Sequence, residues 1–225
     1  PNVRYLTPPR NPESFISLRV SRAGPQPAYR GSVSPPPVIE GDHVRLRKIE
    51  RADLALLHRW LNDADVVMWA RFSPDHMVTR DALEKEYEKE ITGEERERTT
   101  YVIEERSTEK PIGWCVMRTW DRKHVSTNVG IGLGEKAYWG KGYGTEAMRL
   151  LLTVAFDQQR WHRAELWTLA DNARAMGAAK KCGFRIEGRE RESAYFDGKH
   201  RDVYLMAILK SEWDARKKKG ARRRG

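Results

Sequence analysis

The chain has 225 residues and a formal net charge of +10. Its length allows one domain with extensions or two small domains, and it suffices to bury a core. Its two cysteines, Cys115 and Cys182, lie far apart and exclude both a disulfide framework and the ligand spacing of a zinc site, so we expect no metal. The sequence contains no signal peptide and no apolar run of membrane-spanning length, which predicts a cytoplasmic protein without membrane contact.

The excess positive charge lies at the two ends of the chain. Residues 1–40 carry five arginines against two glutamates, and residues 210–225 carry eight lysines and arginines against Glu212 and Asp214, which leaves the middle near +1. We therefore expect a nearly neutral domain over 39–213. Residues 1–38, rich in Pro and Arg, predict an extended or disordered arm. Residues 214–225 predict a basic tail, either solvated or in weak contact with RNA or the ribosome.

The first half of the domain reads as one strand followed by helices. A strand is expected at 44–47, and Asp53 is the expected N-cap of a helix with Leu54, Leu57 and Leu61 on one side. Residues 66–72 form an aromatic-rich connection, either a cover over the core or one side of a substrate pocket. A charged helix is predicted over 79–94.

The second half predicts most of the sheet. Strands at 100–105, 113–120 and 125–133, joined by short polar turns, indicate an antiparallel meander. A glycine-rich turn and a long helix lead to a strand at 164–169 and a helix at 172–182 that Gly183 ends. Two last strands flank an Asp197-Gly198 turn. The class is α/β (α+β), with a mixed, mostly antiparallel sheet of about seven strands and helices on both faces.

The stretch from Val129 to Ala147 carries the strongest functional signal. Val129, Ile131 and Leu133 share one face of the strand, and the glycines between them leave the other face without side chains. That bare face suits a ligand lying against the backbone. The following glycine loop presents amide N–H groups at a helix N-terminus, which favours an anion such as phosphate. The alternative is a tight turn that merely requires glycine.

Two nucleotide motifs compete for this loop. A Walker A loop fails, because Gly142 follows Lys141 where Ser or Thr is required. Gly142-x-Gly144-x-x-Ala147 matches a relaxed dinucleotide motif, with Asp171 as the acidic residue downstream. The order of elements counts against that fold, because the loop follows a meander instead of the first strand.

Several segments together resemble the GNAT superfamily of acyl-CoA N-acyltransferases. Trp139-Gly140-Lys141-Gly142-Tyr143-Gly144 is similar to its central motif, and the helix that Asn172 opens ends in Gly183-Phe184, as in its second motif. The opening Arg47 and Asp53, the Trp60–Asp63 segment and the closing Glu212-Trp213 are similar to the Rim-type branch. That branch includes ribosomal-protein, polyamine and antibiotic acetyltransferases. The resemblance covers about residues 41–213.

The resemblance implies acetyl-CoA as cosubstrate and strands splayed around it. Its pyrophosphate would bind the loop, its pantetheine arm would run along Ile131 to Leu133, and Asn172 would hold that arm. The implied cofactor residues are Ile131, Leu133, Trp139, Gly140, Lys141, Gly142, Tyr143, Gly144, Thr145 and Asn172. The implied activity is direct attack of a primary amine on the acetyl group in a ternary complex. The amine would be a small molecule, a polyamine, an aminoglycoside-like antibiotic or a protein N-terminus, and a homodimer is a further expectation.

Three positions depart from the family pattern. Trp139 stands where the family has Gln or Arg, and Lys141 or Lys136 would compensate for the missing charge. Asn128 stands where the family often has a Glu that acts as the catalytic base. Ala179 stands where the family often has a Tyr that protonates the departing thiolate. Asn128, Asp65 and Tyr204 are the candidates for catalysis. Further bases considered are Asp63, His76 and His124, and a further acid is Tyr195. The departures also allow an alternative: a catalytically weak acyl-CoA-binding or ribosome/RNA-associated interaction protein.

Overall fold

The computed structural model describes residues 38–71, 77–121, 123–196 and 198–222. The expected N-terminal arm lies outside the described residues except for Val38. Phe72, at the end of the aromatic-rich connection, and His76, a candidate base, lie outside them as well.

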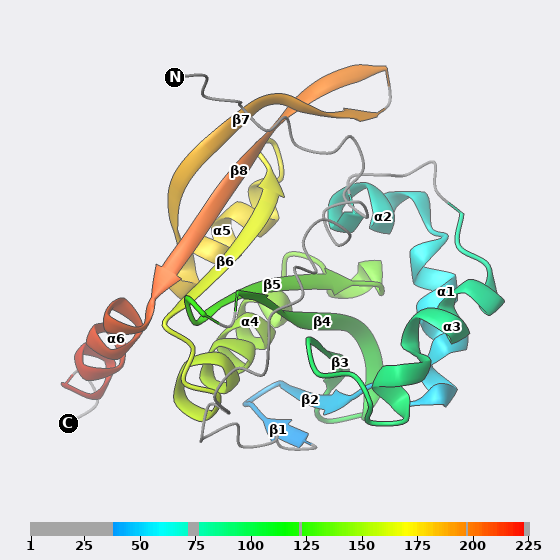
Figure 1. The fold of residues 1–225 in the computed structure, drawn as a ribbon, viewed down its shortest axis with the longest axis horizontal. Coiled ribbons are helices and arrows are strands. Elements are labelled where there is room, and N and C mark those ends of the chain that lie inside the picture. Colours follow the sequence, from blue (N-terminus) through cyan, green and yellow to red (C-terminus); the bar gives the residue numbers. More distant parts are fainter. Residues whose placement is uncertain (1–37, 72–76, 122, 197, 223–225) are drawn as a thin grey trace. The chain divides into compact units, whose positions relative to one another are not determined.

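The described chain builds a mixed sheet in the order β1-β2-β3-β4-β5-β6-β8-β7 (Figure 1). Every neighbouring pair is antiparallel except β5 and β6, which are parallel. The seven expected strands are confirmed, and the short β1 adds an eighth. The strands are β1 (Val38–Glu40), β2 (Val44–Lys48), β3 (Arg98–Glu105), β4 (Lys110–Asp121), β5 (Ser126–Leu133), β6 (Arg163–Leu169), β7 (Arg185–Phe196) and β8 (Lys199–Leu209).

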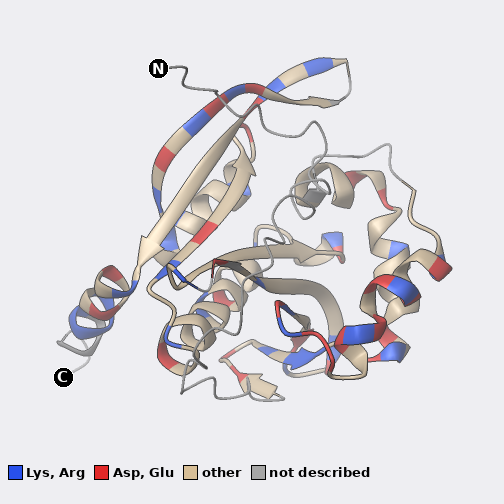
Figure 2. Ribbon diagram, viewed as in Figure 1, with Lys and Arg blue, Asp and Glu red and all other residues tan. Residues whose placement is uncertain are grey.

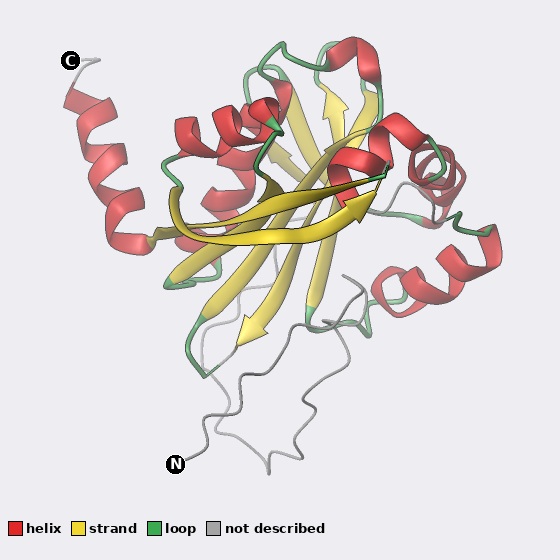
Figure 3. Ribbon diagram, turned by 90° about the horizontal axis from the view of Figure 1, so that it is seen from above, coloured by secondary structure: helices red, strands yellow, loops and turns green. Residues whose placement is uncertain are grey.

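Helices flank both faces of the sheet, as Figure 3 shows. Buried residues of the first three helices share one core cluster, and those of α4 and α5 share another. The helices are α1 (Leu54–Leu61), α2 (Ala64–Arg71), α3 (Arg80–Ile91), α4 (Tyr143–Thr153), α5 (Ala173–Cys182) and α6 (Lys210–Arg222). A π-helical turn, Val154–Gln158, continues α4.

The aromatic-rich connection expected at 66–72 is wrong, because most of it is helix α2. Asp63 begins this helix: its Oδ1 accepts the Asp65 amide at 3.0 Å and the Val66 amide at 3.4 Å. Val66 then packs into the core of the α1–α3 face, and Ala70, one turn later, packs against that core. The N-cap signal at Asp63 was present in the sequence.

The glycine face of β5 is not bare. The indole of Trp114 lies over Gly132, where a Cβ would come within 2.4 Å of the ring, and the indole of Trp60 lies over Gly134, at 2.1 Å. The two rings stack with centroids 6.0 Å apart. The expectation of a ligand on this face is therefore wrong. These glycines make room for core tryptophans, and the opposite face of β5, with Val129, Ile131 and Leu133, packs with the α4 core.

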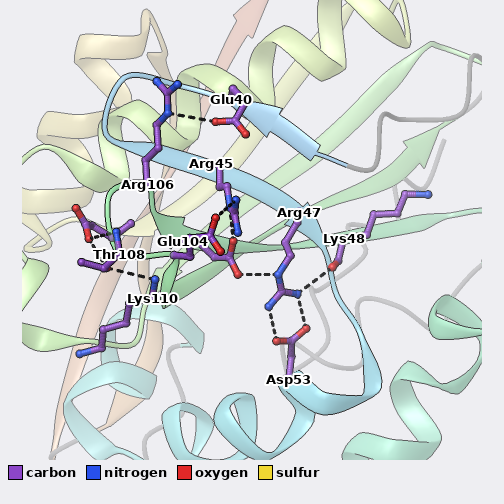
Figure 4. A network of polar contacts seen from close by, with 11 residues as sticks. Glu40, Arg45, Arg47, Lys48, Asp53, Glu104, Arg106, Thr108 and Lys110 are labelled. Atoms are coloured by element: carbon purple, nitrogen blue, oxygen red, sulfur yellow. Dashed lines mark hydrogen bonds and ion pairs between the residues drawn. The ribbon is translucent and has the colours of Figure 1, made fainter.

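An ionic network ties β2, β3 and the start of α1 (Figure 4). Asp53 was expected to cap α1, but its side chain makes no capping hydrogen bond to this helix. It instead accepts two 2.7 Å hydrogen bonds from the Arg47 guanidinium and one from the Glu50 amide. The buried Glu104 accepts from Arg47 Nε and from Arg45 Nε. Hydrogen bonds to Asp53 and Glu104 raise the pKa of Arg47 further above its usual range. The network fixes β2 against β3 and against the start of α1.

The expected boundary at Trp213 falls inside helix α6. Trp213 is 8% exposed and packs against Phe156 with ring centroids 5.9 Å apart. Lys217 pairs with Asp157 at 2.8 Å, and Arg216 donates to the Lys181 carbonyl. The first part of the expected tail is therefore docked on the domain. The basic end of α6 is visible in Figure 2. None of the described helices is long and apolar enough to cross a membrane.

Candidate active site

The two parallel strands at the middle of the sheet pair over only three residues. Ser126 to Asn128 of β5 face Arg163 to Glu165 of β6, and beyond these positions the strands diverge (Figure 1). At the point of divergence Asn128 Nδ2 donates to the Glu165 carbonyl at 3.2 Å. From Val129 to Leu133, β5 pairs with β4 alone. Alternate amide and carbonyl groups of this stretch therefore point into the opening without a strand partner.

The glycine loop lies at the open end of β5 and leads into α4. Gly140 has φ 74° and Gly142 has φ 95°, so both occupy the left-handed region that glycine alone adopts readily. A Cβ at either position would meet no described atom within 4 Å. The glycines are thus required by backbone conformation. Gly144 differs, because a Cβ there would reach ordinary contact with Leu133.

A cavity of about 420 Å³ lies at the N-terminus of α4. Four of the predicted cofactor residues line it: Lys141, Gly142, Tyr143 and Thr145. Lys141, Arg149 and Lys181 bring three cations to it, and the structure gives them no ion-pair partner among the described residues. The helix dipole and these cations favour an anion here.

Two further lining residues, His43 and Glu146, join the β1–β2 turn to α4. Glu146 Oε1 accepts the His43 amide at 2.8 Å, and Oε2 lies 3.1 Å from the His43 ring. Partial burial opposes ionisation of Glu146, but the hydrogen bonds from the His43 and Val44 amides outweigh it and lower the pKa. The Glu146 carboxylate is therefore directed toward His43 and Val44, whose hydrogen bonds fix its position.

The other predicted cofactor residues surround the opening. Trp139 donates its indole N–H to the Leu133 carbonyl at 2.8 Å and so holds the loop against the end of β5. Ile131 and Leu133 pack on the α4 side. Asn172, 6% exposed, caps α5 by accepting the Ala175 amide at 3.0 Å. Its side-chain oxygen is thereby occupied.

The compensating cation expected at Lys136 is engaged elsewhere. Its Nζ lies 2.9 Å from Asp63 and 2.5 Å from Asp65. Arg174 of α5 stacks on Trp139, with its guanidinium carbon 4.2 Å from the ring centroid. Sequence reasoning missed this arginine, because only the fold brings α5 beside the loop.

The catalytic candidates do not converge on the opening. Asn128 lies at the point of divergence, whereas Asp65 pairs with Lys136 and Tyr204 packs with the core of the α4–α5 face. Partial burial disfavours ionised Asp63, but the hydrogen bond from Lys136 prevails and lowers the pKa, which makes it a weaker base.

The remaining candidates sit away from the open end or inside the core. His124 binds Asp121 at the opposite end of β5, and exposed Tyr195 packs against the His200 ring in the β7–β8 hairpin. Ala179, at the family's tyrosine position, is buried.

Comparison with known proteins identifies the architecture. The family model described as the acetyltransferase (GNAT) domain matches residues 43–185. The chain belongs to the GNAT acetyltransferase family. An uncharacterized N-acetyltransferase p20 of Bacillus licheniformis is 26% identical over 76% of this chain and 96% of its own length. The spermidine N(1)-acetyltransferase of Vibrio cholerae is 27% identical over 75% of this chain and 94% of its own length.

Solved structures agree with these relatives. The crystal structure of spermidine N-acetyltransferase from Vibrio cholerae in complex with CoA and spermine aligns with a TM-score of 0.70 at 25% identity. The alignment covers 77% of this chain and 99% of that one. The resemblance to GNAT proteins is confirmed, and with it the mixed α/β fold. This GNAT chain is an N-acetyltransferase enzyme.

Proposed function

We propose that this GNAT enzyme transfers the acetyl group of acetyl-CoA to a primary amine, by direct attack in a ternary complex. The observation that carries the proposal is the divergence of β5 and β6 directly beside a cavity whose lining includes Lys141, Arg149 and Lys181. The extended pantetheine arm of acetyl-CoA, with its amide groups, fits the unpaired edge of one strand. Phosphates fit a helix N-terminus that gathers cations.

Each part of acetyl-CoA can be assigned to a different group of residues along the site. The amides of Gly140 to Thr145, with the three cations, would hold the phosphates, and the edge of Ile131 to Leu133 would hold the pantetheine arm. Asn172, the N-cap residue of α5, would contact the pantetheine arm from the side opposite β5. Acetyl-CoA supplies an acyl group activated as a thioester. The unpaired amides of β5 beyond Asn128 are the donors available to the acyl carbonyl oxygen.

The amine must lose a proton to attack, since free alkylamines have pKa values near about 10. Asn128 cannot accept that proton, and its amide is already used to hold β5 to β6. The described carboxylates Asp63 and Asp65 are bound to Lys136. We infer that the proton passes to solvent and that no single side chain of the described residues is indispensable as a base.

The direct test combines binding with turnover. Calorimetry should detect acetyl-CoA binding, and release of free CoA thiol should accelerate when primary amines are added. Mass spectrometry of the amine then identifies the acetylated product. Binding without any amine-dependent thiol release would favour the second candidate, a catalytically weak acyl-CoA-binding protein, for which Asn128 and the buried Ala179 are the supporting observations.

Contact with RNA through the basic C-terminal end is a separate proposal. Arg216 and Lys217 are engaged with the domain, so the cations of this segment proposed for phosphate are Lys218 and Lys219 together with Arg222, Arg223 and Arg224 of the sequence. Counterion release at up to about five phosphates should then give a clear salt dependence. Filter binding of RNA over a salt series, with and without residues 218–225, tests it. Equal binding by the two proteins would contradict it. Homodimerisation likewise stays a proposal.

A further inference from the structure

One arginine spans the open end between β5 and β6. Arg174 lies in the first turn of α5, on the α4–α5 face of the sheet, yet its guanidinium reaches Trp69 of α2, which belongs to the opposite face. Its carbon is 5.7 Å from the Trp69 ring centroid and 4.2 Å from that of Trp139. Three separate elements therefore meet around one positive charge.

The stacked guanidinium keeps its hydrogen-bonding capacity. Cation–π contacts use the faces of the two indoles, while the N–H donors of arginine point outward in the guanidinium plane. In the part of the chain that the structure describes, Arg174 has no carboxylate or carbonyl partner. Two rings thus orient a fork of donors that has no acceptor within the protein. A carboxylate is the group that such a fork binds with two parallel hydrogen bonds.

The surroundings of Arg174 on the α2 face are apolar. Trp69 also packs with Met68 and Trp167 around the small cluster of Leu169, Ala194 and Val203. Trp167 and Leu169 lie on β6 beyond the last residue paired with β5, so this cluster borders the opening. A substrate that enters from this face meets aromatic surface and one free guanidinium.

The carboxylates described around the opening already have cationic partners. Asp63 and Asp65 bind Lys136, Glu165 binds Arg163 at 3.0 Å, and Asp171 pairs with Arg201. A polycationic acceptor would have to break one of these pairs or approach Arg174 against charge repulsion. This charge pattern disfavours a polyamine.

We propose that the acceptor is a primary amine that carries a carboxylate beside an apolar body, and that Arg174 binds this carboxylate as the specificity-determining residue. This inference rests on the proposed acetyl transfer. It separates the chain from the spermidine acetyltransferases to which it is similar, because it assigns the substrate an anionic group where a polyamine has only cationic ones.

The test compares phenylalanine with 2-phenylethylamine, which differ by the carboxylate, and includes spermidine as a third acceptor. The wild-type enzyme should favour phenylalanine over 2-phenylethylamine by about 10- to 100-fold in kcat/KM, the range of a charge-assisted hydrogen-bonded pair. Arg174→Gln should reduce that ratio to within about threefold of unity and leave the KM for acetyl-CoA unchanged. Arg174→Lys, which keeps the charge without the fork, should restore part of the ratio.

Lys180→Gln is the matched control, because Lys180 is an exposed cation on the same helix. It should leave all three acceptors unaffected. Preference of the wild type for spermidine would overturn the inference while leaving acetyl transfer intact. An equal loss for both phenyl amines in Arg174→Gln, or a raised KM for acetyl-CoA, would also overturn it. Absence of turnover with every primary amine would instead overturn the proposed function, and the inference with it.

Discussion

The two sides of the opening between β5 and β6 are built in different ways. The side with the glycine loop comes largely from one continuous stretch, since Lys141, Gly142, Tyr143 and Thr145 line the cavity together. The other side comes from elements far apart in sequence, with Trp69 on α2, Arg174 on α5 and the small apolar cluster reaching β8. A local site can be recognised as a motif. A site assembled from distant elements becomes visible only in the folded chain.

The largest expected effect comes from disturbing the residue directly after β5, the strand that both sides share. Gly134→Val would place its Cβ about 2.1 Å from the Trp60 ring, so Trp60 or the strand must move. Overpacking of this kind costs about 1–3 kcal/mol and occasionally more. We expect a loss at the upper end of that range in urea unfolding, with both binding and turnover impaired. Gly130→Ala is the control, because its nearest neighbour would lie at 3.3 Å. Equal stability of the two variants would contradict this packing.

A second variant removes a support that belongs to neither side. Arg47→Met leaves Asp53 without its two guanidinium donors and leaves the buried Glu104 with Arg45 alone, and we expect a loss of about 2–3 kcal/mol in the free energy of unfolding. The control is Arg51→Met, whose pair with Glu88 is about half exposed and should contribute below about 1 kcal/mol. Turnover of folded Arg47→Met should stay close to wild type. A large fall in kcat with normal folding would place the network in catalysis.

A smaller effect is expected at the point where the strands part. Asn128→Ala removes one hydrogen bond between β5 and β6, worth about 1 kcal/mol, and leaves the backbone donors of β5 in place. We expect kcat to fall by less than about tenfold in assays of thiol release. A fall of several orders of magnitude at unchanged acetyl-CoA affinity would make Asn128 a catalytic residue.

Much of the fold follows from signals within short windows. The meander, the pairing of the last two strands and the Gly183 helix end each rest on a few neighbouring residues, and all appear in the structure, although Asp197 of the expected turn lies outside the described residues. The prediction of a bare glycine face on β5 was wrong because it depends on residues outside that short window. Trp114 and Trp60 fill this face, and the approach of Trp60 to Gly134 depends on how α1 packs. Alternation along a strand predicts which residues share a face but not which side chain covers them.

The residues of the candidate site also fall into those with a local sequence signal and those without one. The loop, its helix and Asn172 could be placed from motifs, because each function depends on backbone conformation or a helix cap. His43, Arg149 and Lys181 reach the cavity from separate elements and had no local signal. Arg174 is an exposed residue of α5 and has no local signal in the sequence. Its role depends on two tryptophans, one of them more than a hundred positions earlier in the chain.

The central claim is that the loop binds acetyl-CoA while the distant residues bind the acceptor. Calorimetric titration of acetyl-CoA into Gly142→Val and Arg174→Gln, side by side with the wild type, tests it most directly. Valine at φ 95° strains the loop by about 1–2 kcal/mol or more, so Gly142→Val should bind at least about tenfold more weakly. Arg174→Gln should bind acetyl-CoA as the wild type does. Unchanged affinity in folded Gly142→Val, or an equal loss in Arg174→Gln, would contradict the account.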